Sequence, residues 1–245
     1  MYHKNIAATF ALVAVSLPGL SLGNIATAQT FEQSSSQSVR ERLLPREYSS
    51  RIGFVPPLES GTPRRTRSGA TRDLQCGGTA LVPASGLGLT TEARPLLHMY
   101  VEPSVQKLLL TVEGIDDDYT KEVELSGEGG IVEVSLPEPV KALEIGEEYS
   151  WSLIMICGEA LRPDSPIVAG DIRRVESIFT PSQAQSISLA EQASAYGDAG
   201  VWHDLISTLT TMRLDNPEDM QVQTHWESVL EVVGLSALAD EPFLR

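Results

Sequence analysis

One apolar segment indicates the centre of the fold: Trp151-Ser152-Leu153-Ile154-Met155-Ile156-Cys157. After Ser152 every residue in it is apolar, so both faces of an extended chain would be buried. Because side chains alternate across a strand, Trp151 and Cys157 would point to the same side. We therefore predict a central β-strand over Tyr149–Cys157.

Five further β-prone segments lie around it in the chain, separated by Gly, Pro, Asp or Ser residues. Two of them, 119–125 and 131–136, alternate polar and apolar residues, which predicts strands with one face in water. No helical period interrupts the series, so residues 76–180 are predicted to form an antiparallel β-sandwich. The five segments are Leu96–Val101, Leu108–Glu113, Tyr119–Leu125, Ile131–Leu136 and Ile167–Val175.

Residues 181–245 instead show a period near 3.6, which predicts helices over Leu189–Tyr196, Val201–Arg213 and Glu218–Val233. Asn216 is expected to cap the third helix, with a proline in its first position. Gly234 would end it. The chain is therefore predicted to be an α+β protein, with a sandwich followed by a small helical region.

The first two helices have the residue spacing of a tetratricopeptide hairpin, in which a glycine lets the helices approach and aromatic side chains fill the gap. A stable array needs about three repeats, and the sequence holds one such unit. We therefore predict a tetratricopeptide-like hairpin plus one helix. The residues in this spacing are Ala193, Tyr196, Gly200, Trp202 and Leu205.

The charge of the chain is strongly negative and unevenly distributed. Lys and Arg number 18 against 33 Asp and Glu, for a net charge of −15. Such a chain is not expected to bind nucleic acid or anionic lipid, which require clustered basic residues. Residues 39–75 nevertheless carry eight Arg and four acidic residues, whereas 76–245 carries nine basic and 28 acidic residues.

The basic residues lie in a Ser-, Gln-, Arg- and Pro-rich stretch, 29–75, which is predicted to be a disordered or loosely attached arm. The arm would either bind an anionic partner, or fold back on the acidic domain, or serve as a solvated linker.

The N-terminus has the three parts of a secretory signal peptide. Lys4 gives a positive start, an apolar run follows over 6–17, and Ala26-Thr27-Ala28 forms an A-x-A cleavage motif. We predict a signal peptide over 1–28, cleaved between Ala28 and Gln29. A retained membrane anchor is the alternative, but the run is shorter than the ~20 residues that a bilayer requires. The protein is therefore expected to be exported, to the periplasm or beyond, with no stable membrane span.

The two cysteines, Cys76 and Cys157, both follow the predicted cleavage site. An even number of cysteines in an oxidising compartment favours a disulfide between them. A reactive thiol is an alternative, although neither cysteine belongs to a C-x-x-C motif; two buried free thiols are the other.

Several short motifs occur in a fixed order along the chain. The motifs are Thr79–Pro83, Gly88–Thr91 before Pro95, Gly130–Val132 leading to Leu136-Pro137, Gly146 with Tyr149-x-Trp151 and Cys157, Gly170-x-Ile172-x-Arg174-Val175, and Tyr196 with Gly200-Val201-Trp202-x-Asp204. With these motifs the chain resembles the exported cyanobacterial domain of unknown function DUF928 from about residue 54 to 235, and it departs from that pattern at His98 and Asp171. The resemblance implies an extracytoplasmic protein and supplies no catalytic residues.

No catalytic motif stands out: the chain has no nucleophile elbow, phosphate-binding loop or H-E-x-x-H zinc motif. His203-Asp204 and His225, on neighbouring predicted helices, could approach a metal ion, but a surface histidine and an acid near a helix cap is the preferred interpretation. Asp116–Asp118 is interpreted as an acidic turn rather than a calcium site. Ser85–Gly88 is interpreted as a flexible loop. We predict no catalytic residue, no cofactor and no metal.

Two classes of function remain. The leading prediction is an exported, non-enzymatic adaptor or protein-interaction module of the periplasm or cell envelope, with a protein partner of unknown identity. The alternative is an uncharacterised envelope hydrolase or carbohydrate-binding module that uses acidic residues. The alternative requires a cleft with two convergent carboxylates or an exposed row of aromatic side chains, whereas the three tryptophans are interpreted as core.

Overall fold

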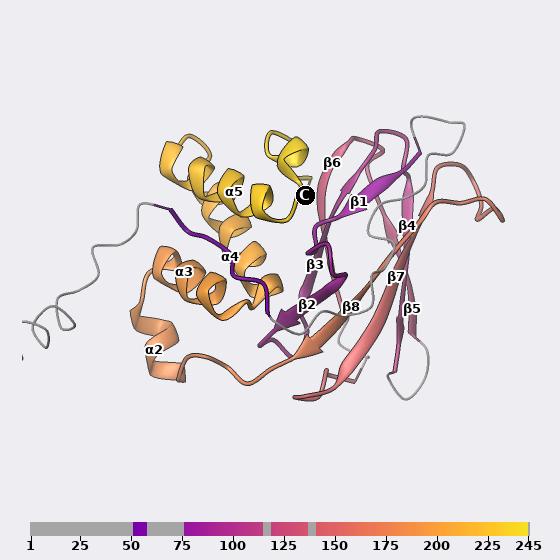
Figure 1. The fold of residues 1–245 in the computed structure, drawn as a ribbon. Coiled ribbons are helices and arrows are strands. Elements are labelled where there is room, and N and C mark those ends of the chain that lie inside the picture. The colour runs from indigo at the N-terminus through magenta and orange to yellow at the C-terminus, as the bar shows by residue number, and fades with distance from the viewer. Residues whose placement is uncertain (1–50, 58–75, 115–118, 137–140, 245) are drawn as a thin grey trace, which may run out of the picture. The chain divides into compact units, whose positions relative to one another are not determined.

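Two β-sheets face each other in the computed structural model of the chain, which describes residues 51–57, 76–114, 119–136 and 141–244 (Figure 1). All of these residues belong to one compact unit. The smaller sheet has the strand order β1 (Gly78–Ala80), β3 (Leu96–Val101) and β6 (Gly130–Ser135). The larger sheet has the order β2 (Leu87–Thr90), β8 (Ile167–Arg174), β7 (Glu148–Ile156), β4 (Lys107–Glu113) and β5 (Tyr119–Glu124).

The two sheets share one apolar core. Met99 of β3 and Leu110, Leu153 and Met155 of the larger sheet are all fully buried in the same cluster. Alternate residues of β7 are buried, as the period of a strand requires. β7 is also the middle strand of its sheet, which confirms the prediction from its apolar sequence.

The six predicted strands are present, with ends that differ by at most one residue, but two strands were missed and one pairing differs. β1 and β2 are short and rich in Gly and Thr, so they lack a clear alternating pattern. β2 pairs with β8 in parallel, with Leu87 opposite Asp171, whereas the prediction was antiparallel throughout. The prediction of a flexible loop over 85–88 is therefore wrong for its last two residues, which belong to β2.

The C-terminal residues cover the outer edge of β6. Phe243 forms a parallel bridge with Ile131. The Ile131 amide donates to the Pro242 carbonyl at 2.7 Å, and the Leu244 amide donates to the Ile131 carbonyl at 2.8 Å. The edge of the smaller sheet is thus paired at this point.

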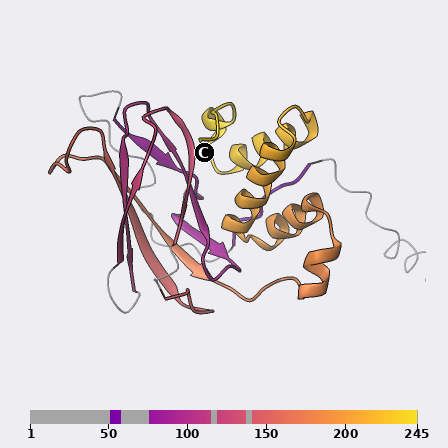
Figure 2. The same ribbon diagram turned by 180° about the vertical axis from the view of Figure 1, so that it is seen from behind.

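The helices are α2 (Pro181–Ser186), α3 (Leu189–Ala199), α4 (Trp202–Asp215) and α5 (Met220–Val232), followed by a short 3-10 turn, η1 (Ser236–Leu238). They lie on the side of the smaller sheet, away from β4 and β5 (Figures 1 and 2). Their core includes Trp202 and Trp226, together with Leu81 and Ile131 from the β region. The helices and the smaller sheet therefore share a second apolar core.

The ends of the helices follow local signals, with one correction. Gly200 ends α3 in the left-handed conformation at φ 71°, which a glycine adopts at no steric cost. Helix α5 begins after Asp219, whose side chain accepts from the amides of Gln221 and Val222. The prediction of Asn216 as the cap was wrong. The cap is Asp219, three residues later, whose carboxylate accepts these two hydrogen bonds.

Cys76 and Cys157 form a disulfide with a Cα–Cα distance of 5.9 Å, as predicted. Cys76 lies just before β1 and Cys157 just after β7, so the bond links the two sheets. Within the described ranges, no helix has the length and apolar character needed to cross a bilayer. The predicted signal peptide, with Ala28 and Gln29, lies outside the described residues.

Candidate functional site

A pocket of about 340 Å³ opens where α3 and α4 meet the connection between β2 and β3. Its lining mixes apolar and polar residues, and the polar ones include Glu92, Arg94, Tyr196, Asp204 and Ser207. These residues come from the β2–β3 connection and from the two helices. The pocket is therefore bounded by the same elements that join the helical region to the sheets.

The start of α4 is anchored to the β region by three consecutive residues. The Trp202 indole donates to the Leu81 carbonyl at 2.7 Å, and the whole side chain is buried. His203 packs against β2, and Asp204 bonds to Thr90, the last residue of this strand, and to Thr91 after it. Because α4 contacts both β2 and β3, these bonds set the position of the helix on the sheets.

Both carboxylate oxygens of Asp204 are already hydrogen-bonded. Oδ2 accepts from the Thr90 hydroxyl at 2.7 Å, and the Thr91 amide lies 3.2 Å from each oxygen. The Thr91 hydroxyl donates to Oδ1. Burial raises the pKa of Asp204 and the nearby Glu92 raises it further, whereas the bonds from Thr90 and Thr91 lower it. Since its oxygens are occupied by donors of the chain, Asp204 fixes structure here rather than acting as a free base.

His203 is a neutral, fully buried histidine. Its pKa is lowered to about 3, mainly by burial and also by the neighbouring His98, whereas a hydrogen bond to the Leu96 backbone acts in the opposite direction. Its Nε2 atom has no hydrogen-bond partner within the described residues. A Cβ atom on Gly88 would lie 2.3 Å from Nε2, so β2 can approach α4 this closely only with glycine at that position.

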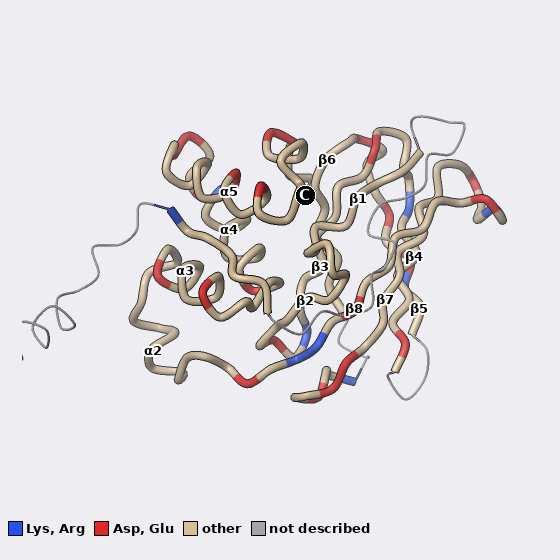
Figure 3. The backbone as a smooth tube through the Cα atoms, in the orientation of Figure 1, with Lys and Arg blue, Asp and Glu red and all other residues tan. Residues whose placement is uncertain are grey.

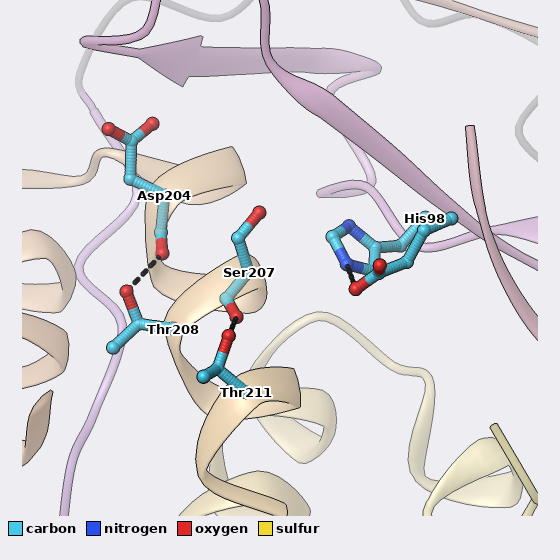
Figure 4. Close-up of polar contacts among 6 residues, drawn as sticks. His98, Asp204, Ser207, Thr208 and Thr211 are labelled. Carbon is cyan, nitrogen blue, oxygen red and sulfur yellow. Dashed lines mark hydrogen bonds and ion pairs between the residues drawn. The ribbon is translucent and has the colours of Figure 1, made fainter. Parts of the chain in front are cut away.

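His98 and several hydroxyls complete the polar contacts beside α4 (Figure 4). His98 Nε2 lies 3.1 Å from Glu133 Oε1, which lowers the pKa of Glu133. The Thr208 hydroxyl donates to the Asp204 carbonyl at 2.7 Å, and the Thr211 hydroxyl donates to the Ser207 carbonyl at 2.9 Å. These hydroxyls are used within the helix.

The structure does not assemble the candidate metal ligands. His203 and Asp204 face β2 and its following residues, whereas Nδ1 of His225 on α5 accepts from the Ile52 amide at 3.0 Å. No group of three or more His, Cys, Asp or Glu side chains suited to a metal occurs in the described part of the chain. Residues 116–118, the acidic turn, lie outside it.

Residues 51–57, here called the strap, cross the helical region between α3 and α5 (Figure 1). Ile52 and Phe54 are buried, and the Phe54 ring lies edge-on to Trp202 with centroids 4.7 Å apart. The Val55 amide donates to the Gly197 carbonyl at 3.0 Å. The prediction of a disordered or loosely attached arm over 29–75 thus does not hold for these seven residues, and the rest of the arm, 29–50 and 58–75, lies outside the described residues.

The strap fits against α3 because position 197 has no side chain. A Cβ atom on Gly197 would lie only 2.0 Å from the Gly53 carbonyl oxygen. We call the surface under the strap, formed by Gly197, Trp202 and His225, the strap seat. The one sequence signal of the strap was the short apolar run over 52–57, which is too brief for a period to be recognised.

Residues 60–243 match the family model of the Domain of Unknown Function DUF928. The chain belongs to the DUF928 family. No curated protein and no solved structure matches it.

The DUF928 match covers both cysteines and every residue that lines the pocket, whereas the strap precedes the first matched residue. The strap seat itself lies inside the match. Within this DUF928 chain, the strap is therefore a segment from outside the matched range that covers a surface inside it.

Proposed function

We propose that this protein is a non-enzymatic interaction module of the periplasm or cell envelope that binds an extended segment of a protein partner at the strap seat. The observation that carries the proposal is the strap itself. A seven-residue extended segment lies on the helices, with the side chains of Ile52 and Phe54 buried. Two of its backbone amides donate hydrogen bonds, one to the Gly197 carbonyl and one to Nδ1 of His225. A surface that holds one extended segment in this way has the chemistry to hold another.

The strap is held by backbone contacts and by side-chain anchors. Two of the contacts use backbone amides of the strap, which any residue except proline can supply. The anchors are two apolar side chains separated by a glycine. A partner segment would therefore need an apolar residue and, two positions later, an aromatic residue, whereas the position between them is open because a Cβ atom on Gly53 would meet nothing within 4 Å.

We further interpret α3 and α4 as a tetratricopeptide-like hairpin and the two sheets as a β-sandwich platform. Support comes from Gly200 at the turn between the helices, from buried Ala193 and Trp202, and from the core that the two sheets share. The exposed apolar side chains of Met220 and Val232 on α5 also favour a partner on the helical side.

The test uses a fluorescent peptide of residues 49–58 and the full chain carrying Phe54→Ser, which weakens the chain's own strap. We expect saturable binding by fluorescence anisotropy at pH 7.5, and weaker binding to the unchanged chain, whose seat is occupied. Adding Gly197→Ala to the Phe54→Ser chain should abolish binding, because the new Cβ occupies the place of the Gly53 carbonyl. Alanine favours helix, so α3 itself is not weakened.

A peptide that itself carries Phe54→Ser is the matched control and should not bind. Equal binding of both peptides, or binding that survives Gly197→Ala, would contradict the proposed seat. Affinity capture from the native envelope with the same variants then identifies the partner. The variants should capture the partner in the same order in which they bind the peptide.

The alternative, an envelope hydrolase or carbohydrate-binding module, has one supporting observation. Glu92 and Asp204 both line the pocket, which meets the requirement for two carboxylates in one cavity. The occupied oxygens of Asp204 weigh against it. If this alternative is wrong, a Glu92→Gln chain should show the same glycan binding on an array, and the same cleavage of chromogenic glycosides, as the unchanged chain.

Export is the remaining part of the proposal. The disulfide supports an oxidising compartment. The net charge of the described domain is negative, with Asp and Glu spread over helices and sheets (Figure 3). N-terminal sequencing of the protein from its native host should begin at Gln29. A first residue of Met1 would contradict export by this signal.

A further inference from the structure

The strap is joined to α5 by a hydrogen bond that depends on the protonation of one side chain. The Ile52 amide donates to Nδ1 of His225 at 3.0 Å. An imidazole nitrogen accepts a hydrogen bond only when it carries no proton, so the bond selects the neutral ring with its proton on Nε2.

Protonation of His225 would place two donors opposite each other. Nδ1–H would then face the Ile52 N–H across the same short distance, and the amide would lose its acceptor. Because Ile52 is buried on the seat, water cannot replace that acceptor while the strap is docked. The strap must therefore either lift or hold an unpaired buried amide beside a positive charge.

We propose that His225 is a pH-sensitive latch: the neutral imidazole holds the strap on its seat, and protonation releases it. The latch itself follows from the contacts of the strap. The use of the latch rests on the proposed function. At acidic pH the seat would be exposed to a partner segment that presents a hydrogen-bond acceptor, rather than an amide, to His225.

Charged residues of α5, the strap and α4 lie on the described elements around His225. Asp219, at the start of α5, raises the pKa of His225 through its negative charge. Arg51 is the charged residue of the strap and is exposed. Arg213 of α4 instead lies over the rings of Trp226 and Phe243, 5.7 Å and 5.5 Å from their centroids.

Burial is the largest influence and lowers the pKa of His225 below its usual value of 6.5. The lifted strap exposes the ring and returns the pKa toward 6.5. Docking is therefore fully favoured above pH 6.5 and is lost as the pH falls through the lowered pKa of the docked state. The docking equilibrium constant falls by up to about tenfold per pH unit in that window.

Hydrogen exchange of the full chain between pH 7.5 and 4.5, corrected for the intrinsic rate at each pH, tests the latch. The reporter is the Val55 amide, which bonds to the Gly197 carbonyl and does not touch His225. We expect its protection factor to fall as the pH is lowered in the unchanged chain, by no more than about tenfold per pH unit. It should stay nearly constant in His225→Asn, whose amide oxygen accepts at the position of Nδ1 and does not titrate.

Amides of α4 are the internal reference, because their protection reports unfolding of the helical region as a whole. His225→Ala, which has no acceptor, should show low Val55 protection at every pH. Constant Val55 protection in the unchanged chain, or an equal fall in His225→Asn, would overturn the latch.

Peptide binding separates the latch from the proposed function. Release of the strap at acidic pH, together with no binding of the 49–58 peptide to the Phe54→Ser chain at pH 7.5, would support the latch and refute the seat as a docking site. Peptide binding at pH 4.5 that is equal in the Phe54→Ser chain with and without His225→Asn would support the seat and refute the latch.

Discussion

Acidification should unfold this protein through His203, and the burial of that side chain sets the size of the effect. Its pKa falls from 6.5 to about 3 on folding. The unfolded chain therefore binds one more proton than the folded chain between these two values. A folded-state pKa below the unfolded value means that the stability is fully present above pH 6.5 and is lost as the pH falls toward 3.

The magnitude follows from the width of that window. Each pH unit below 6.5 removes about 1.4 kcal/mol, so two units, at pH 4.5, remove roughly 3 kcal/mol of the free energy of unfolding. The raised pKa of Asp204 acts in the opposite direction and the lowered pKa of Glu133 acts in the same direction. Both groups are present in a His203→Asn chain, so the difference between the two chains isolates His203.

The assay is urea denaturation followed by far-UV circular dichroism at pH 7.5, 6.0 and 4.5. The Asn side chain leaves some unfilled volume and lowers the stability at every pH, so the comparison is of slopes. We expect the unchanged chain to lose roughly 3 kcal/mol more than His203→Asn between pH 7.5 and 4.5. Equal losses in the two chains would refute the neutral, buried state of His203.

Three further changes test the junction of helix and sheet and the disulfide. Asp204→Ala should lower the free energy of unfolding by about 3 kcal/mol, because the buried Thr91 amide and two hydroxyls lose their acceptor. Asp204→Asn should lower it less, since one oxygen remains, and equal, small losses in urea melts would contradict the network. Gly88→Ala should cost about 1–3 kcal/mol by forcing a methyl group against the buried imidazole of α4, and an unchanged melting temperature would contradict that contact. Replacing Cys76 and Cys157 together by serine should cost about 4 kcal/mol, because the bond closes a loop of 81 residues; a loss under about 1 kcal/mol would show that the loop-entropy argument fails here.

The sequence predicted those elements whose signals are local. The apolar run of β7 and the alternation in β5 identify strands because burial on one or both faces dictates the residue type at each position. The helices follow their apolar period in the same way. The parallel pairing of Leu87 with Asp171 leaves no such signal, because β2 has four residues and its partner lies more than 80 positions away.

Sequence reasoning named two residues of the pocket, His203 and Asp204, but it preferred a surface position for the histidine, which the structure buries. His203 and Asp204 were identified as possible ligands because of their types, yet Asp204 bonds to Thr90 and Thr91, which lie 114 and 113 positions earlier. Nothing local to α4 specifies these partners. The strap was missed for the same reason: the contact of Ile52 with His225 joins positions 173 residues apart.

The pairing of Pro242–Leu244 with β6 has a consequence for the time at which folding can finish. A ribosome makes the chain from its N-terminus, so β6 exists for more than a hundred residues of synthesis before its outer partner is made. During that interval an unpaired strand edge is available to other chains. Passage of the chain to a place where it folds only after synthesis is complete would remove this hazard, and a protein ending before residue 242 would carry it permanently.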